Sequence, residues 1–121
     1  MNITTIASKI FIKENSLVST KIEEINLNKD ELGELKINIT ISGFSKKSDY
    51  SKINLLFSDI IESKFYYTHS YNFYNVENFK LLPIDGCIYL SFDPDTSNDK
   101  KSDDDSDFIL AKKLELFIVN N

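Results

Sequence analysis

The sequence predicts an all-β fold, either an antiparallel β-sandwich or a partly open barrel, with at most one short helix near residues 102–111. Three observations support this prediction: the chain has many short strand-like segments, turn residues separate them at regular intervals, and helical periodicity is almost absent. The chain has 121 residues, a length that one hydrophobic core commonly serves. We therefore expect a single β-rich domain over residues 1–121, with an acidic loop at 93–107.

The first expected hairpin lies in the N-terminal half of the chain. Residues 34–42 form the clearest strand, because apolar and polar side chains alternate along it. Residues 29–33 before it are typical of a turn whose glycine is free to adopt a positive φ. Residues 20–27 would be the other arm, and since their alternation breaks between Ile22 and Ile25, we expect a bulge there.

A long bent strand is expected over residues 52–67, with Ile61 among its inward apolar residues. Asp59 falls on the same inward parity, and an unpaired buried charge would be costly. Either a bulge rotates Asp59 outward or its carboxylate is hydrogen-bonded.

Further strands are expected towards the C-terminus. Residues 79–82 and 87–92 should form a hairpin, because the Asp-Gly step between them is a strong turn signal. Residues 114–119 should form a final strand. The N-terminal segment is ambiguous, and residues 9–13 could be a strand.

The strongest electrostatic feature is the stretch 93–107, which holds seven aspartates in fifteen residues. Ser102 followed by three aspartates resembles a helix start, because a serine cap and early acidic residues suit the positive end of a helix dipole. This is the basis for the short helix expected near 102–111. A structureless loop of this length is uncommon unless it is functional or disordered, so the stretch is a candidate partner surface.

The net charge limits the classes of partner. With a formal charge of −5 and no arginine, the chain lacks the clustered basic residues that bind nucleic acid. An acidic surface instead favours basic proteins or cations. Cys87 is the single cysteine, so no intrachain disulfide can form, and no signal peptide or membrane-length apolar run is visible. We expect a cytoplasmic protein with no membrane contact.

Catalysis and cofactor binding have little support in the sequence. His69 is the single histidine, and neither a nucleophile nor a carboxylate motif surrounds it. One cysteine and one histidine cannot fill the four positions of a zinc site. Residues 93–104 fit a calcium loop only loosely, since glycine and glutamate are missing from the sixth and twelfth positions. We expect no catalytic residue, no metal and no cofactor.

Aromatic residues concentrate between residues 65 and 79, where about half would enter the core. Tyrosines can lie at a surface with a dry ring and a wet hydroxyl, and tyrosine is enriched at binding hot spots. Tyr66, Tyr71 and Tyr74 are therefore candidate anchors, provided that they share a face with the acidic loop.

Five motifs in the C-terminal two-thirds of the chain carry a resemblance. They are LLFSDIIE at 55–62, FYY at 65–67, NFYNV at 72–76, YLSFDP at 89–94 and DDDSDFI at 103–109. Together they resemble small single-domain bacterial proteins that occur as immunity or orphan genes beside polymorphic or contact-dependent toxins. The resemblance implies a β-rich fold and protein binding, and it carries over no catalytic residues.

The first functional hypothesis is thus an immunity-type protein that binds and neutralises a cognate bacterial toxin, for example a basic nuclease. Its partner-binding residues would be Asp95, Asp99, Asp103, Asp104, Asp105, Tyr66, Tyr71 and Tyr74. The alternatives are a calcium- or carbohydrate-binding β-sandwich module, or a non-catalytic interaction protein of another role.

Overall fold

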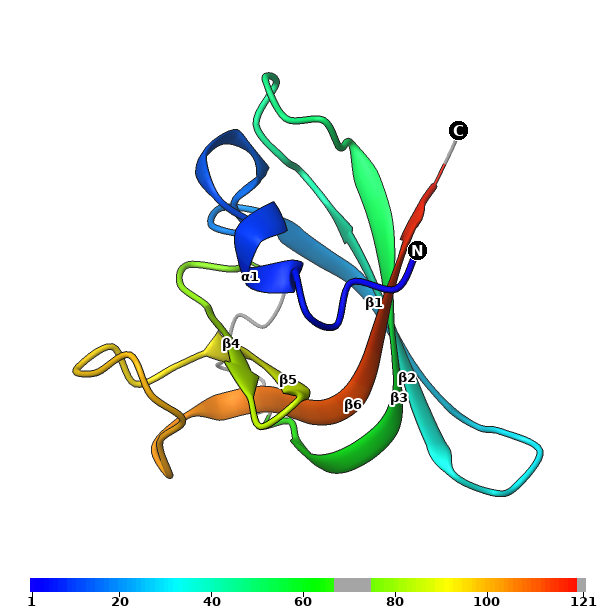
Figure 1. Cartoon of the computed structure of the whole chain (residues 1–121). Coiled ribbons are helices and arrows are strands. Elements are labelled where there is room, and N and C mark those ends of the chain that lie inside the picture. Colours follow the sequence, from blue (N-terminus) through cyan, green and yellow to red (C-terminus); the bar gives the residue numbers. More distant parts are fainter. Residues whose placement is uncertain (67–74, 120–121) are drawn as a thin grey trace.

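The computed structural model describes residues 1–66 and 75–119. Its six strands form one antiparallel sheet in the order β1-β2-β3-β6-β5-β4, and this sheet is not closed (Figure 1). The strands are β1 (Lys21–Lys29), β2 (Leu35–Ser42), β3 (Lys52–Lys64), β4 (Lys80–Ile84), β5 (Cys87–Asp93) and β6 (Ser106–Ile118). The all-β prediction is confirmed. Because the described strands share one sheet, the open architecture fits better than two packed sheets.

The hairpin of β1 and β2 follows the expected pattern. Its register shifts between Ile22 and Glu24, which confirms the bulge predicted from the broken alternation. Gly33 in the connecting turn has a φ of 82°, a value that glycine adopts without steric cost. The carboxylate of Asp30 accepts the backbone N–H groups of Leu32 and Glu34, both at 2.9 Å, and so closes the turn.

The long strands β3 and β6 pair along most of their length and bend together (Figure 1). Asp59 in β3 has a φ of 51°, and the β3–β6 register shifts between Ile60 and Glu62. This irregularity rotates Asp59 to the surface, where it is exposed, so the first of the two outcomes expected for this residue is confirmed. The same rotation leaves Ile61 52% exposed, and its predicted inward position is wrong.

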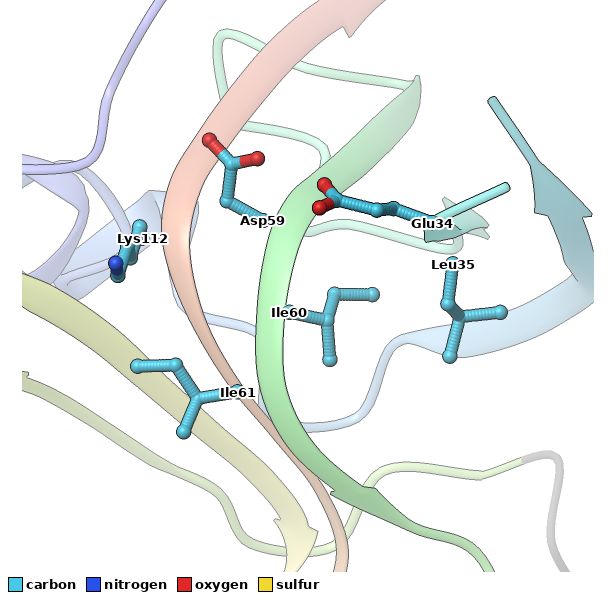
Figure 2. A pocket seen from close by; sticks show the side chains of 6 residues that line it. All are labelled: Glu34, Leu35, Asp59, Ile60, Ile61 and Lys112. Carbon is cyan, nitrogen blue, oxygen red and sulfur yellow. The ribbon is translucent and has the colours of Figure 1, made fainter. Parts of the chain in front are cut away.

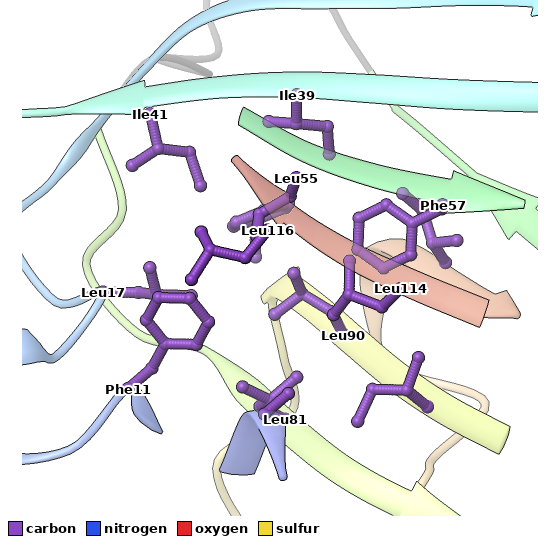
Figure 3. Close-up of a cluster of buried hydrophobic side chains, with 14 of the residues drawn as sticks. Phe11, Leu17, Ile39, Ile41, Leu55, Phe57, Leu81, Leu90, Leu114 and Leu116 are labelled. Carbon is purple, nitrogen blue, oxygen red and sulfur yellow. The ribbon is translucent and has the colours of Figure 1, made fainter. Parts of the chain in front are cut away.

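Aliphatic and aromatic side chains fill the concave side of the bent sheet (Figure 3). Alternate residues of β2 and β3 contribute fully buried side chains: Ile37, Ile39, Ile41, Ile53, Leu55 and Phe57. Leu90 of β5 and Leu114 of β6 pack into the same cluster. Period-two patterning thus places one face of each central strand in the core.

The N-terminal segment covers this core with the short helix α1 (Ala7–Ile10) and a 3₁₀ turn at Lys13–Asn15. It is fixed to β6, because the backbone N–H of Ile3 donates to the Leu114 carbonyl at 2.9 Å. The strand considered for residues 9–13 is therefore wrong. Ala7 and Phe11 are both buried, and a spacing of four residues places them on one helical face.

The helix expected near residues 102–111 is also wrong in position. Residues 102–105 form a turn, in which the Asp105 backbone N–H donates to the Ser102 carbonyl at 3.1 Å. β6 begins at Ser106 and pairs with β5 on one side and β3 on the other. Within its apolar run of 108–111, Phe108, Ile109 and Ala111 are buried, and the Phe108 ring packs against that of Tyr89 at a centroid distance of 5.5 Å.

The hairpin of β4 and β5 is confirmed. Asp85 and Gly86 form its turn with φ values of 48° and 80°, as a tight two-residue hairpin connection requires. None of the helices in the described ranges is long and apolar enough to cross a membrane.

Candidate functional site: the acidic segment

The acidic segment, defined as residues 93–107, joins β5 to β6 and is held at its base by one buried carboxylate. Asp105 is 1% exposed. Its Oδ1 accepts hydrogen bonds from the Lys80 ammonium at 2.9 Å and the Asp95 backbone N–H at 2.8 Å. Its Oδ2 accepts from the Tyr89 hydroxyl at 2.7 Å and the Ser102 backbone N–H at 2.9 Å. The carboxylate thus ties the segment to strands β4 and β5.

The Lys80 ammonium supplies the positive charge at the centre of this arrangement. Lys80 is 7% exposed, and its Nζ also donates to the Lys100 carbonyl at 2.7 Å and to Asn98 Oδ1 at 3.3 Å. Three oxygen atoms of the acidic segment therefore surround one buried ammonium. Because a buried charge is tolerated only when it is paired and hydrogen-bonded, this contact set fixes the path of the segment.

The electrostatics of Asp105 follow from these contacts. Burial alone would raise the pKa of its carboxyl, but the hydrogen bonds from Lys80, Tyr89 and the two backbone N–H groups outweigh burial and lower this pKa to about 2. Burial, followed by the hydrogen bond to Asp105, raises the pKa of the Tyr89 phenol far above its ordinary value. At neutral pH the carboxylate is therefore charged and the phenol remains a donor.

Short side-chain turns order the outer part of the segment. The carboxylate of Asp95 accepts the Ser97 backbone N–H at 3.0 Å and the Ser102 hydroxyl at 3.3 Å. Hydrogen bonds from Ser97, and then from Ser102, lower the pKa of the Asp95 carboxyl against the opposing effect of burial. The Ser102 hydroxyl in turn accepts the Asp104 backbone N–H at 3.1 Å. The segment thus has a defined conformation, because consecutive turns satisfy its backbone groups.

The predicted aspartates divide into two groups. Asp99, Asp103 and Asp104 are exposed and Asp95 is half-buried, so these four can present negative charge to a partner. Asp105 was expected to join them, and its burial corrects that expectation: both of its oxygens are occupied within the protein.

Tyr66 is the predicted tyrosine that the structure describes, and it lies at the base of the acidic segment. Its backbone N–H donates to Asp107 Oδ1 at 2.8 Å, and the residue is 53% exposed. This hydrogen bond places the Tyr66 backbone beside the Asp107 end of the segment. Tyr71 and Tyr74, like His69, fall outside the described residues.

A lysine of the segment folds back onto the sheet. The Lys101 ammonium lies 5.4 Å from the centroid of the Phe108 ring and 5.7 Å from that of the Tyr89 ring. It also lies 3.7 Å from Glu62 Oε1 in β3. These contacts draw one of the two positive charges of the segment toward the sheet and away from its exposed carboxylates.

Sequence reasoning missed Lys80 and Tyr89 as the residues that organise the segment. The available signal was a lysine that precedes the apolar run Leu81–Leu82 and a tyrosine inside an otherwise apolar strand, since both side chains need polar partners when buried. Among the described residues, no group of three or more His, Cys, Asp or Glu side chains is placed to hold a metal ion.

Comparisons with known proteins give no relative: no protein-family model, curated protein or solved structure matches the chain.

Proposed function

We propose that this protein binds a basic protein partner through the exposed carboxylates of the acidic segment and has no catalytic activity of its own. The observation that supports this most strongly is the buried Asp105–Lys80 pair at its base. This pair holds the segment in one arrangement in which Asp99, Asp103 and Asp104 remain exposed. A flexible tail of the same composition would need to become ordered on binding.

Preorganisation gives this arrangement its value for binding. Immobilising a side chain at an interface costs about 0.5–1.5 kcal/mol, and ordering a loop adds to that cost. The turns around Asp95 and Ser102 impose most of this order before any partner arrives. The fixed negative surface would also steer a positively charged partner during diffusional encounter.

Tyr66 supplies a neighbouring apolar contact. A half-exposed tyrosine at the margin of a charged surface can bury its ring against a partner while its hydroxyl stays hydrated. Tyrosines of this kind are frequent among residues that contribute most to binding free energy. We propose Tyr66 as an anchor beside the electrostatic surface.

The class of partner that we propose is a bacterial toxin, and the protein would then be a cytoplasmic immunity-type inhibitor. This follows from the resemblance of motifs such as 55–62 and 103–109 to immunity-type proteins, and from the charge of −5. A nuclease needs a cleft rich in Lys and Arg to bind phosphates, and such a cleft would be complementary to exposed aspartates. Occupying it would prevent access of nucleic acid.

The calcium-binding alternative has less support from the observed contacts. In the loose calcium frame, the Asp95 carboxylate accepts hydrogen bonds from protein donors. The oxygens at the centre of the segment surround the Lys80 ammonium. Calcium would have to compete with a cation that the protein itself supplies.

The proposal is tested by affinity capture from a lysate of the native cells with the intact protein as bait. A variant carrying Asp99→Asn, Asp103→Asn and Asp104→Asn is used in parallel. We expect the wild-type protein to retain a basic protein that the variant loses. The variant lacks three exposed charges but keeps the contacts of Asp105 with Lys80 and Tyr89.

The matched control carries Glu24→Gln, Glu31→Gln and Asp85→Asn, which remove the same charge from exposed positions outside the acidic segment. This control should retain the partner. Equal capture by all three proteins, or equal loss in both variants, would contradict a role for the acidic segment. A captured protein that shows no toxicity on expression alone would contradict the immunity function and leave only protein binding.

A further inference from the structure

Beyond Phe57, strand β3 separates from β2 and leaves one of its edges without a strand partner in the described ranges. The β2–β3 ladder ends at the pair Ile37–Phe57. β3 nevertheless continues to Lys64 along β6 on its other side. Residues 58–64 therefore present backbone N–H and C=O groups on an open edge, and such an edge is a template for a further strand.

A groove lies where the two strands diverge. Its volume is about 520 Å³, and Figure 2 shows the six side chains that line it: Glu34, Leu35, Asp59, Ile60, Ile61 and Lys112. Leu35 is 39% exposed and Ile61 is 52% exposed. Exposed apolar surface of these two residues thus lies in the groove beside the open edge of β3, among the charged side chains of Glu34, Asp59 and Lys112.

The irregular backbone of β3 creates this groove. Asp59 has a φ of 51°, and one extra residue lies between the paired residues Ile60 and Glu62. A bulge of this kind increases the local twist and bends the strand. β3 therefore leaves the direction of β2, and Ile61 is turned out of the core into the groove.

The groove has a negative rim. Figure 2 shows the carboxylates of Asp59 and Glu34 extending to the same side of the groove, whereas the Lys112 ammonium points away from them. Within residues 1–66 and 75–119, neither carboxylate forms an ion pair. Two carboxylates on the rim of a groove that also exposes Leu35 and Ile61 are complementary to a segment that carries both Lys or Arg and aliphatic side chains.

We propose that this groove binds an extended basic segment of a partner protein, which adds as a strand to residues 58–64 of β3. Its backbone would pair with the open edge, its aliphatic side chains would cover Leu35 and Ile61, and its Lys or Arg side chains would meet Asp59 and Glu34. Strand addition of this kind takes affinity from main-chain hydrogen bonds and specificity from alternate side chains.

A second copy of the chain is a poorer occupant. It would bring another Asp59 and another Glu34 to the same place, and each copy has a net charge of −5. Like charges that face each other across a strand pair destabilise the pairing. The groove is separate from the acidic segment, because Glu34 and residues 58–61 lie outside residues 93–107.

The test uses the intact, isotope-labelled protein and a synthetic seven-residue peptide of alternating lysine and valine. Amide hydrogen exchange is measured with and without saturating peptide. We expect exchange to slow at least about tenfold at amides within residues 58–64, because strand pairing protects the edge. The corresponding peptide of glutamate and valine should give no protection.

Two sets of variants locate the site. The double variant Asp59→Asn, Glu34→Gln should bind the lysine peptide about tenfold more weakly. Asparagine tolerates the positive φ at position 59, so the backbone should keep its conformation there. Ile61→Lys should abolish binding, whereas Ile118→Lys, a matched change at a residue 59% exposed, should not.

Three outcomes would overturn the proposal. One is protection at the acidic segment only, with no effect of the Asp59 and Glu34 substitutions. Another is equal protection by the lysine and glutamate peptides. The last is protection of residues 58–64 that rises with protein concentration in the absence of peptide, which would assign the edge to a second copy.

Discussion

Replacing the buried Asp105 with asparagine should destabilise the fold far more than the same replacement at any exposed aspartate of the acidic segment. The carboxylate accepts four hydrogen bonds, two on each oxygen. An asparagine amide keeps one oxygen and turns the other into a donor, so two of the four donors lose their acceptor. In addition, the Lys80 ammonium, 7% exposed, loses its negative partner.

The magnitude follows from these losses. Each buried donor without an acceptor costs about 1–3 kcal/mol, and breaking a buried ion pair by removing one partner costs about 3–5 kcal/mol. Because these terms describe the same atoms, they do not add, and we expect a decrease of about 3–5 kcal/mol in the free energy of unfolding. For a chain of this length, that corresponds to a fall of roughly 10–20 °C in Tm.

The assay is urea and thermal unfolding followed by circular dichroism. Asp104→Asn is the control, because Asp104 is the exposed neighbour of Asp105 and should change stability by less than about 0.5 kcal/mol. Adding Lys80→Met to Asp105→Asn removes the unpaired ammonium, so the double variant should lose less than the sum of the two single variants. If the Asp105→Asn variant were as stable as Asp104→Asn, the four hydrogen bonds of the Asp105 carboxylate would not stabilise the fold as proposed.

Three further predictions concern the contacts of Asp105 and the hydrophobic core. The pKa of Asp105 is about 2 in the folded protein, below its ordinary value of 3.8; its stabilisation is therefore complete above pH 4 and is lost as pH falls from about 4 to 2. That loss should reach about 2–3 kcal/mol and should be absent from the pH–stability profile of Asp105→Asn. Tyr89→Phe keeps the ring but removes a hydrogen bond to a charged group, and urea unfolding should show a loss of about 1.5–3 kcal/mol; no change would mean that the hydroxyl is dispensable. Leu55→Ala should cost about 2–5 kcal/mol because Leu55 is fully buried; a cost under 1 kcal/mol would contradict its place in the core.

Local patterns in the sequence were sufficient to predict several elements. The alternation in 34–42, the broken alternation near Ile22 and the Asp85–Gly86 turn each depend on neighbouring residues, and each is confirmed. The outward rotation of Asp59 was predicted as one of two outcomes, since a charge at an inward position must either be hydrogen-bonded or reach solvent. Its consequence for Ile61 was not foreseen, because a bulge changes the parity of every residue after it.

The remainder depends on contacts between distant residues. Lys80 and Asp105 are 25 positions apart, and nothing in their local sequence states that they meet. Long-range pairing also explains why the helix expected near 102–111 does not form: from Ser106 onward the chain pairs as β6 with β5 on one side and β3 on the other. For the candidate site, the aspartates and Tyr66 stay predicted partner-binding residues, whereas the buried Asp105–Lys80 pair at the base of the segment was not predicted.

The most direct test of docking through the acidic segment is the association rate between the protein and its captured partner, measured as a function of salt concentration. The variant with asparagine at positions 99, 103 and 104 should associate at least about tenfold more slowly at low ionic strength, with a flatter dependence on salt. Its dissociation rate should change less, since steering acts before contact. An association rate and a salt dependence equal to those of the wild-type protein would contradict a docking role for the acidic segment.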